Sequence, residues 1–199
     1  MIMAAATQIY LASQSPRRRE LLQQIGIKFR VLAPDVNEAA LPREAPTDYV
    51  ERIARIKAEV AWMRVVERRM KRYPVLAADT AVILGRRILG KPQSDAEAAS
   101  MLQALSGRTH QVITAVAMVF EGKLKLTRSE SAVTFRRLAS DDILHYVASG
   151  EPHDKAGAYA IQGFAAAFIS RIDGSYSGVM GLPLFEASRL LKSFGVQVL

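Results

Sequence analysis

The stretch that decides the fold runs from residue 75 to residue 84 and reads VLAADTAVIL. This nearly unbroken apolar run has the length of a β-strand, and such a run is typical of a central strand covered on both faces. One carboxylate, Asp79, stands inside it. Burying an ionised carboxylate is costly unless a cation, a metal ion or paired donors compensate it. Asp79 is therefore either a structural ion-pair partner or a functional group.

Strand and helix patterns alternate on both sides of this run. Before it we expect strands at 9–12 and 29–32, a helix from Ser15 to Gly26, and a long helix capped by Thr47 that reaches about Arg72. After it we expect helices at 94–106 and 140–150, a hairpin of 110–120 with 123–135, a strand at 165–172 and a final helix after Pro183. No repeat or linker interrupts the pattern. The sequence predicts a single mixed α/β domain over residues 1–199.

The composition narrows the possible partners. The chain has 199 residues, a formal net charge of +8 and no cysteine. A basic surface favours anions, which include nucleic acid, anionic lipid and phosphorylated small molecules. The lack of cysteine excludes disulfides, thiolate zinc sites and cysteine nucleophiles, and a reducing cytosol permits it. No apolar run approaches the roughly 20 residues of a membrane span. We expect a cytoplasmic protein without a membrane partner, whose metal, where one binds, has oxygen ligands.

A basic segment stands at the start of the first predicted helix. Residues 13–18 read SQSPRR, so Ser13, Arg17 and Arg18 lie at a helix N-terminus. Free backbone N–H groups and the helix dipole favour a phosphate at such a place, whereas cationic side chains oppose the dipole. A bound polyanion would reconcile the two arginines with the helix. The alternative is a solvated basic face.

Three further charged residues are candidates for the same chemistry. Lys57 lies within the apolar stripe of its predicted helix, so its ammonium either extends to solvent or points into a polar pocket. Glu38, in a polar loop, is either a second carboxylate for a hard metal ion or a solvated loop residue. Lys91 ends a G-x-x-x-x-G-K pattern, but Pro92 stands where a P-loop needs serine or threonine. We reject a P-loop ATPase and keep Lys91 as a phosphate contact.

The segment from residue 156 to residue 163, AGAYAIQG, combines small residues with one amide side chain. Small residues permit close backbone approach, and the amide of Gln162 can both donate and accept, as recognition of a base edge requires. The alternative is a tight structural loop. Thr80, directly after Asp79, adds a hydroxyl that either serves the site or packs in the strand.

Six motifs lie in order across nearly the whole chain. They are LASQSPRR at 11–18, ADT at 78–80, GKP at 90–92, LSGRTH at 105–110, DKAGAY through QG at 154–163, and GLPL at 181–184. Together they resemble the Maf family (septum formation inhibitor-like proteins) of nucleoside triphosphate pyrophosphatases. The resemblance implies an elongated, ITPase-related α/β fold, with a mixed β-sheet flanked by helices and a cleft between two lobes. It also implies a homodimer, a divalent metal cation (Mg²⁺ or Mn²⁺), and cleavage of the α–β phosphate bond to a nucleoside monophosphate and pyrophosphate.

The resemblance also assigns roles by position. Asp79 matches the proposed proton acceptor, and we expect it to act as base or metal ligand with Glu38 as metal support. The positions tied to substrate choice are Arg17, Thr80 and Gln162. The other conserved polar positions of the cleft are Ser13, Arg18, Glu38, Lys57 and Lys91. Of these residues, we assign the cations Arg17, Arg18, Lys57 and Lys91 to the triphosphate.

The late motif is similar to that of the branch that acts on dTTP and UTP, rather than the branch that takes 7-methyl-GTP. Ala160 stands where glycine is usual, and His153 replaces a residue that is often tryptophan. A rival from another class is a nucleic-acid-binding regulator of division that lacks catalysis. The aromatic residues are not interleaved with the basic clusters, and such a protein has no use for a buried Asp79. We expect no stable nucleic-acid binding.

Overall fold

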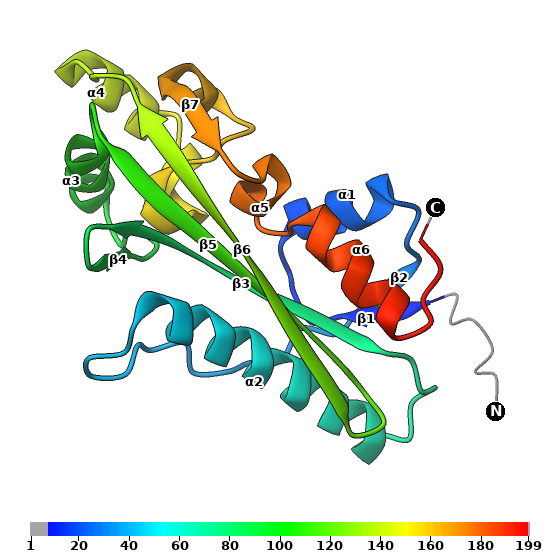
Figure 1. Ribbon diagram of the computed structural model, residues 1–199. Coiled ribbons are helices and arrows are strands. Elements are labelled where there is room, and N and C mark those ends of the chain that lie inside the picture. Colours follow the sequence, from blue (N-terminus) through cyan, green and yellow to red (C-terminus); the bar gives the residue numbers. More distant parts are fainter. Residues whose placement is uncertain (1–7, 199) are drawn as a thin grey trace. The chain divides into compact units, whose positions relative to one another are not determined.

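A computed structural model describes residues 8–198 and confirms the mixed α/β class (Figure 1). Residues 1–7 and 199, which the predicted single domain includes, lie outside the described residues. The chain divides into two compact units. Of the described residues, the first unit holds 8–79, 114–129 and 181–198, and the second holds 80–113 and 130–180.

Helices and strands alternate along the chain. The strands are β1 (Ile9–Leu11), β2 (Phe29–Val31), β3 (Val75–Leu84), β4 (Arg87–Leu89), β5 (Thr109–Phe120), β6 (Lys123–Phe135) and β7 (Ile169–Asp173). The α-helices are α1 (Pro16–Gln24), α2 (Pro46–Glu67), α3 (Asp95–Leu105), α4 (Ser140–Ala148), α5 (Tyr176–Met180) and α6 (Leu184–Ser193). Three 3₁₀ helices, η1 (Glu151–Asp154), η2 (Ala156–Ala158) and η3 (Phe164–Phe168), fill the segment between α4 and β7. The strands form one mixed sheet in the order β2-β1-β3-β5-β6-β7, with β4 paired to β3.

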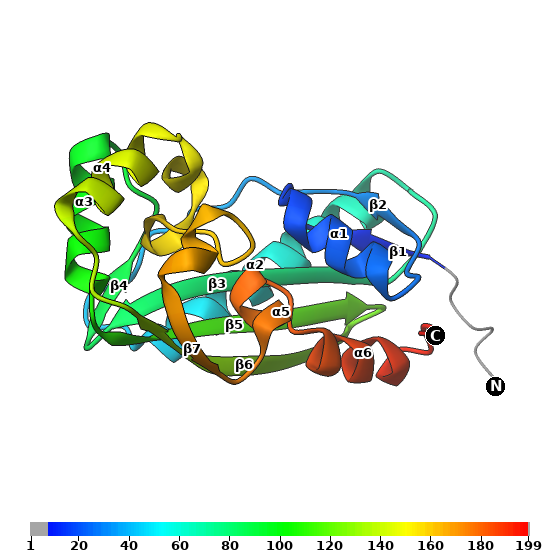
Figure 2. The same cartoon turned by 90° about the horizontal axis from the view of Figure 1, so that it is seen from above.

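The first unit is built on parallel strand pairs. β1 pairs with β2, with Ile9 opposite Phe29, and on its other edge with β3, with Tyr10 opposite Val75. Parallel strands require a crossover, and α1 and α2 supply the two crossovers here. Figures 1 and 2 both show α1 beside β1 and β2. The largest fully buried side chains of this unit include Leu22, Ile53 and Leu76. The apolar run that predicted β3 is therefore a buried strand, as expected.

The predicted limits of α2 are wrong at both ends. Pro46 takes the first helical turn after Ala45, and Thr47 does not cap the helix. Proline suits this place because its missing N–H would have no helical partner there. The helix ends at Glu67 because Arg69 adopts a left-handed φ of 49°, and the Met70 N–H then donates to the Val65 carbonyl at 2.9 Å.

The second unit confirms most of its predicted elements. Ser94 caps α3, and its Oγ accepts a bond from the Glu97 N–H at 3.2 Å. The strand β4 is an addition to the prediction, and it pairs with β3 through a turn at Gly85. The predicted strand at 165–172 is displaced, because η3 occupies Phe164–Phe168 and β7 begins only at Ile169.

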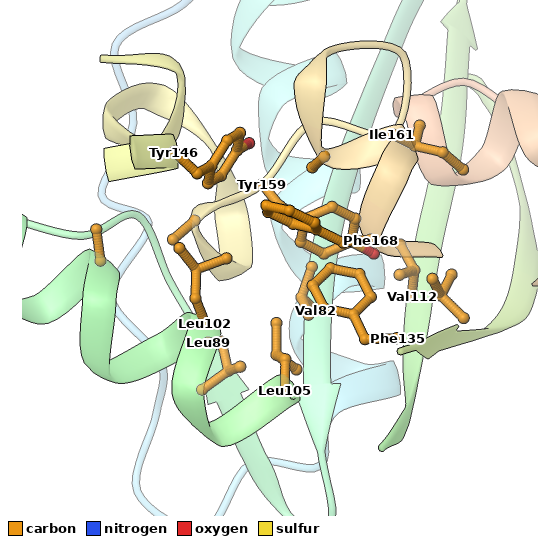
Figure 3. Close-up of a cluster of buried hydrophobic side chains, with 14 of the residues drawn as sticks. Val82, Leu89, Leu102, Leu105, Val112, Phe135, Tyr146, Tyr159, Ile161 and Phe168 are labelled. Carbon is orange, nitrogen blue, oxygen red and sulfur yellow. The ribbon is translucent and has the colours of Figure 1, made fainter. Parts of the chain in front are cut away.

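Aromatic rings pack among aliphatic side chains in the core of the second unit (Figure 3). The rings of Phe135 and Tyr159 meet edge to face at 4.9 Å, and those of Tyr146 and Phe168 at 5.2 Å. His110 is buried among them with 2% of its surface exposed. Its Nε2 lies 2.8 Å from the Tyr159 hydroxyl. Burial lowers the pKa of His110 from 6.5 to about 4.

No helix among the described residues is both long and apolar enough to cross a membrane.

The depressed pKa of His110 predicts an acid-sensitive fold. Because the folded-state pKa of about 4 lies below the unfolded value of 6.5, the unfolded chain takes up the proton first as the pH falls. The stabilisation is complete above pH 6.5 and is lost on acidification toward pH 4, by about 3 kcal/mol. Urea unfolding at pH 7 and pH 4 should show that His110→Gln lowers this pH dependence.

A matched control is available on α4. His145 is exposed, so His145→Gln should keep the acid sensitivity of the wild-type protein. A His110 variant that is as acid-sensitive as the wild type would contradict the interpretation.

Candidate active site

Asp79 lies at the centre of a buried ionic cluster in the first unit. Its Oδ1 is 2.8 Å from the Nζ of Lys57, and the same Nζ is 2.8 Å from Oε1 of Glu38. Asp79 is 6% exposed and Lys57 8% exposed. Lys57 therefore points inward from α2 instead of extending to solvent. One ammonium group thus pairs with two carboxylates, Glu38 and Asp79, that lie 41 positions apart in the sequence.

The charges in this cluster act on one another. Burial raises the pKa of Asp79, and the positive charges of Lys57 and Arg18 partly offset the rise. Burial lowers the pKa of Arg18, and the negative charges of Asp79 and Glu38 oppose that shift. Arg18 thus belongs to the same electrostatic environment as the two carboxylates. A carboxylate with a raised pKa is a better proton acceptor than an ordinary surface aspartate.

Arg18 is fixed by bonds within the first unit. Its Nη1 donates to Ser13 Oγ at 3.1 Å, and its Nε donates to the Gly181 carbonyl at 2.8 Å. Ser13 Oγ also accepts a bond from the Ser15 N–H at 3.2 Å. The Ser15 side chain does not cap α1, and the first turn of α1 has no acidic residue. The electrostatics at this helix start therefore suit an anion.

The loop that carries Glu38 is held by side chains of α2. Tyr49 donates its hydroxyl to the Glu38 carbonyl at 3.1 Å. Arg52 forms two bonds with the Glu44 carboxylate, at 2.5 and 2.7 Å, and a third with the Ala39 carbonyl at 3.0 Å. Although the Glu38 side chain is 49% exposed, its backbone is thus anchored to the helix that also presents Lys57.

Tyr49 and Arg52 are absent from the sequence-based predictions. Burial and the nearby charges of Asp79 and Glu38 raise the pKa of Tyr49 to about 12, so its phenol remains a neutral donor. The two residues are three positions apart, so their side chains share one face of α2. This spacing indicates a polar face on α2, but it does not identify the loop that the two side chains contact.

The structure brings five of the predicted site residues together in the first unit. They are Ser13, Arg18, Glu38, Lys57 and Asp79. Arg17, on α1, acts on the same group of charges, because its positive charge contributes to lowering the pKa of Arg18.

The remaining predicted residues lie in the second unit. Thr80 is half-buried and follows Asp79 in β3, where successive side chains point to opposite faces. Lys91 is exposed, and its carbonyl accepts a bond from the Gln93 amide at 3.1 Å. Gln162 is also exposed. The assignment of these three residues to the substrate stays a prediction.

Comparison with known sequences decides the family. The sequence model of the family described as "Maf-like protein" matches residues 8–194. This chain belongs to the Maf family. It is 55% identical to the dTTP/UTP pyrophosphatase of Nitrosomonas europaea over 100% of both chains. It is 54% identical to the dTTP/UTP pyrophosphatase of Nitrosospira multiformis over 96% of each.

The fold has a solved counterpart. The structure of the Staphylococcus aureus Ham1 protein aligns with a TM-score of 0.50 and 18% sequence identity, over 94% of this chain and 97% of that chain. At this identity the similarity concerns the fold alone. It agrees with the α/β sheet architecture that the Maf resemblance implies.

The donor set of the Maf-family site fits a hard divalent cation that is shared with a ligand. No group of three histidine, aspartate or glutamate side chains in residues 8–198 is arranged to hold a metal ion. Glu38 and Asp79 do converge on one ammonium, and Mg²⁺ in proteins commonly uses one or two carboxylates plus phosphate oxygens and water. The two carboxylates therefore suit a cation that binds together with a phosphorylated substrate.

The ion pairs of Lys57 predict a large effect on stability. Lys57→Met leaves Asp79 buried without its nearest cation, and this should lower the free energy of unfolding at pH 7 by about 3 kcal/mol. The double variant Lys57→Met/Asp79→Asn should recover part of the loss, because it removes the uncompensated buried charge. Urea unfolding of the wild type and both variants measures the difference.

Arg128→Met is the matched control for this experiment. Arg128 pairs with Glu51 at 2.7 Å, but this ion pair is largely exposed, so its loss should cost less than about 1 kcal/mol. If the Lys57 and Arg128 variants lost the same free energy of unfolding, the buried ion pair would contribute no more to stability than an exposed one.

Proposed function

We propose that this Maf-family protein hydrolyses dTTP and UTP to the nucleoside monophosphate and pyrophosphate. The observation that carries the proposal is the buried carboxylate of Asp79, held by Lys57 and surrounded by the charges of Arg18 and Glu38. The names of the full-length relatives support the substrate class. The proposed enzyme is a hydrolase of nucleotide metabolism that acts in the cytoplasm as a homodimer.

The reaction needs a water molecule, a proton acceptor and cationic groups. The water oxygen forms a bond to the α-phosphorus, the bond from that phosphorus to the α–β bridging oxygen breaks, and pyrophosphate leaves. We assign the water proton to the Asp79 carboxylate. Its Oδ1 accepts the bond from Lys57, which leaves Oδ2 as the atom assigned to receive the proton. The raised pKa of Asp79 favours this transfer.

The basic residues stabilise the charge that develops on the phosphates. Lys57 and Arg18 are the cations of the buried cluster, and Arg18 is oriented by Ser13 and the Gly181 carbonyl. Fixed donors of this kind cost no reorganisation when the charge develops. Arg17 at the start of α1 adds a further guanidinium. Glu38 and Asp79 would hold a Mg²⁺ or Mn²⁺ ion, which would neutralise charge on the triphosphate.

We assign three other residues to the substrate because of their positions in the Maf motifs. Thr80 and Gln162 match positions tied to substrate choice, and Lys91 matches a polar position that we assign to the triphosphate. The AGAYAIQG motif that contains Gln162 is similar to the motif of the branch that acts on dTTP and UTP. The amide of Gln162 suits the edge of a pyrimidine base.

A panel of triphosphates tests the proposed function. We expect dTTP and UTP to be hydrolysed fastest in the presence of Mg²⁺ or Mn²⁺, compared with CTP, ATP, GTP and 7-methyl-GTP. Ion-exchange chromatography should identify the nucleoside monophosphate and pyrophosphate as products. Orthophosphate with a nucleoside diphosphate would contradict the proposed bond cleavage. Preferential hydrolysis of 7-methyl-GTP would place the chain in the other branch.

Asp79→Asn tests the proton acceptor. The substitution keeps the size of the side chain but removes its basicity, so kcat for dTTP should fall about a thousandfold while the far-ultraviolet circular dichroism is unchanged. Asp35→Asn is the control, because Asp35 is an exposed acidic residue in the loop that carries Glu38. Near-normal pyrophosphate release by Asp79→Asn would overturn the mechanism.

A further inference from the structure

Gln162 stands at the tip of a tight turn in the second unit. The Gly163 N–H donates to the Ala160 carbonyl at 3.0 Å, so residues 160–163 form a β-turn with Ile161 and Gln162 at its centre. Ile161 is 4% exposed and belongs to the aromatic core, whereas Gln162 is exposed (Figure 3). The turn is therefore anchored in the core by Ile161, and it presents the Gln162 side chain outward.

Two side chains hold both ends of this turn. Oε2 of Glu151 accepts a bond from the Phe164 N–H at 3.0 Å, and Oε1 accepts one from the Tyr146 hydroxyl at 2.8 Å. The Tyr146 hydroxyl in turn accepts a bond from the Ala160 N–H at 3.2 Å. One chain of hydrogen bonds thus joins Ala160, the first residue of the turn, to Phe164, the residue after it.

The end of α4 puts Glu151 in this position. Gly150 adopts a left-handed φ of 75°, and its N–H donates to the Val147 carbonyl at 3.0 Å, so the chain reverses directly after the helix. Tyr146, on the last turn of α4, is 3% exposed and packs edge to face on Phe168. Both members of the hydrogen-bond chain are therefore fixed by the helix and the core, not by the turn itself.

Gly163 shows how closely the carboxylate approaches the turn. A Cβ atom at this position would overlap the Glu151 carboxylate. The φ of Gly163 is −103°, which any residue can adopt, so the close approach of Glu151, and not the backbone conformation, favours glycine here. The Glu151 carboxylate is thus in direct contact with the backbone that carries Gln162.

We propose that Glu151 and Tyr146 are positioning residues that hold the Gln162 turn and thereby set the preference for pyrimidine over purine triphosphates. This inference rests on the proposed function and on the assignment of Gln162 to the base. An amide can select a base edge only when its donor and acceptor atoms are held in place, because hydrogen bonds weaken steeply with misalignment. A charged acceptor such as a carboxylate forms the stronger bonds that such positioning needs.

Glu151→Gln and Tyr146→Phe test the proposal in the full-length enzyme. Each should lower the ratio of kcat/KM for dTTP to kcat/KM for dATP about tenfold, the size expected for losing a hydrogen bond to a charged group. The change should lie mainly in KM for dTTP. In hydrogen exchange followed by mass spectrometry, peptides that cover residues 160–164 should exchange faster in both variants than in the wild type.

Tyr159→Phe is the matched control. It removes another buried hydroxyl from the same core, but that hydroxyl bonds to His110 and not to the Gln162 turn. Its dTTP/dATP ratio should equal that of the wild type. A purely structural role of Glu151 and Tyr146 would make all three variants alike in selectivity.

A double-mutant cycle tests whether Glu151 affects the dTTP/dATP ratio through Gln162 or through a general change in the fold. In a Gln162→Ala background, Glu151→Gln should change the dTTP/dATP ratio no further, because the residue that it positions is gone. Additive losses, or wild-type selectivity in both single variants, would overturn the inference while the proposed function stands. A wild-type protein that releases no pyrophosphate from any triphosphate would overturn the proposed function and the inference together.

Discussion

The buried Asp79 carboxylate constrains the packing of the first unit, because it needs a cation close to it. A charge in the middle of an apolar strand is tolerated only when a partner reaches it, and Lys57 reaches it from α2 at 2.8 Å. This requirement fixes how α2 lies relative to β3, because a shift of one residue in the helix would turn Lys57 to another side. Small side chains at Ala54, Ala58 and Ala61, all fully buried, let the helix approach closely. The packing and the ion pair thus depend on each other.

The charges of the same cluster bear on the triphosphate substrate of the proposed function. Two carboxylates, Glu38 and Asp79, meet two cations, Lys57 and Arg18, so the charges of this group nearly balance. A triphosphate brings several negative charges into this balance. Arg17 at the start of α1 and the divalent metal of the proposed function would offset them. A metal therefore fits the charge of the site as well as its oxygen ligands.

Much of the fold and part of the site follow from sequence patterns. Asp79 is conspicuous because one charge interrupts an apolar run, and the buried strand β3 is found for the same reason. The role of Lys57 is predictable only in part. Helical periodicity places Lys57 on the buried face of its helix, but it does not predict the two carboxylates that Lys57 contacts. Tyr49 and Arg52 escape prediction because they bond to the backbone of an irregular loop, whose path no periodicity encodes. The wrong cap of α2 has a local cause, as Pro46 begins the helix one residue before Thr47.

In each unit, a side chain on or after a helix holds a loop that carries a proposed site residue. An irregular segment carries little order of its own, and fixing each of its residues costs conformational entropy. In the first unit, Arg52 on α2 bonds to the loop backbone beside Glu38. In the second unit, Glu151, directly after α4, bonds to the backbone beside Gln162. In both cases a charged side chain on or after a helix bonds to a main-chain group one or two positions after the proposed site residue. The positions of Glu38 and Gln162 are then determined by the neighbouring main chain, and Glu38 also pairs with Lys57.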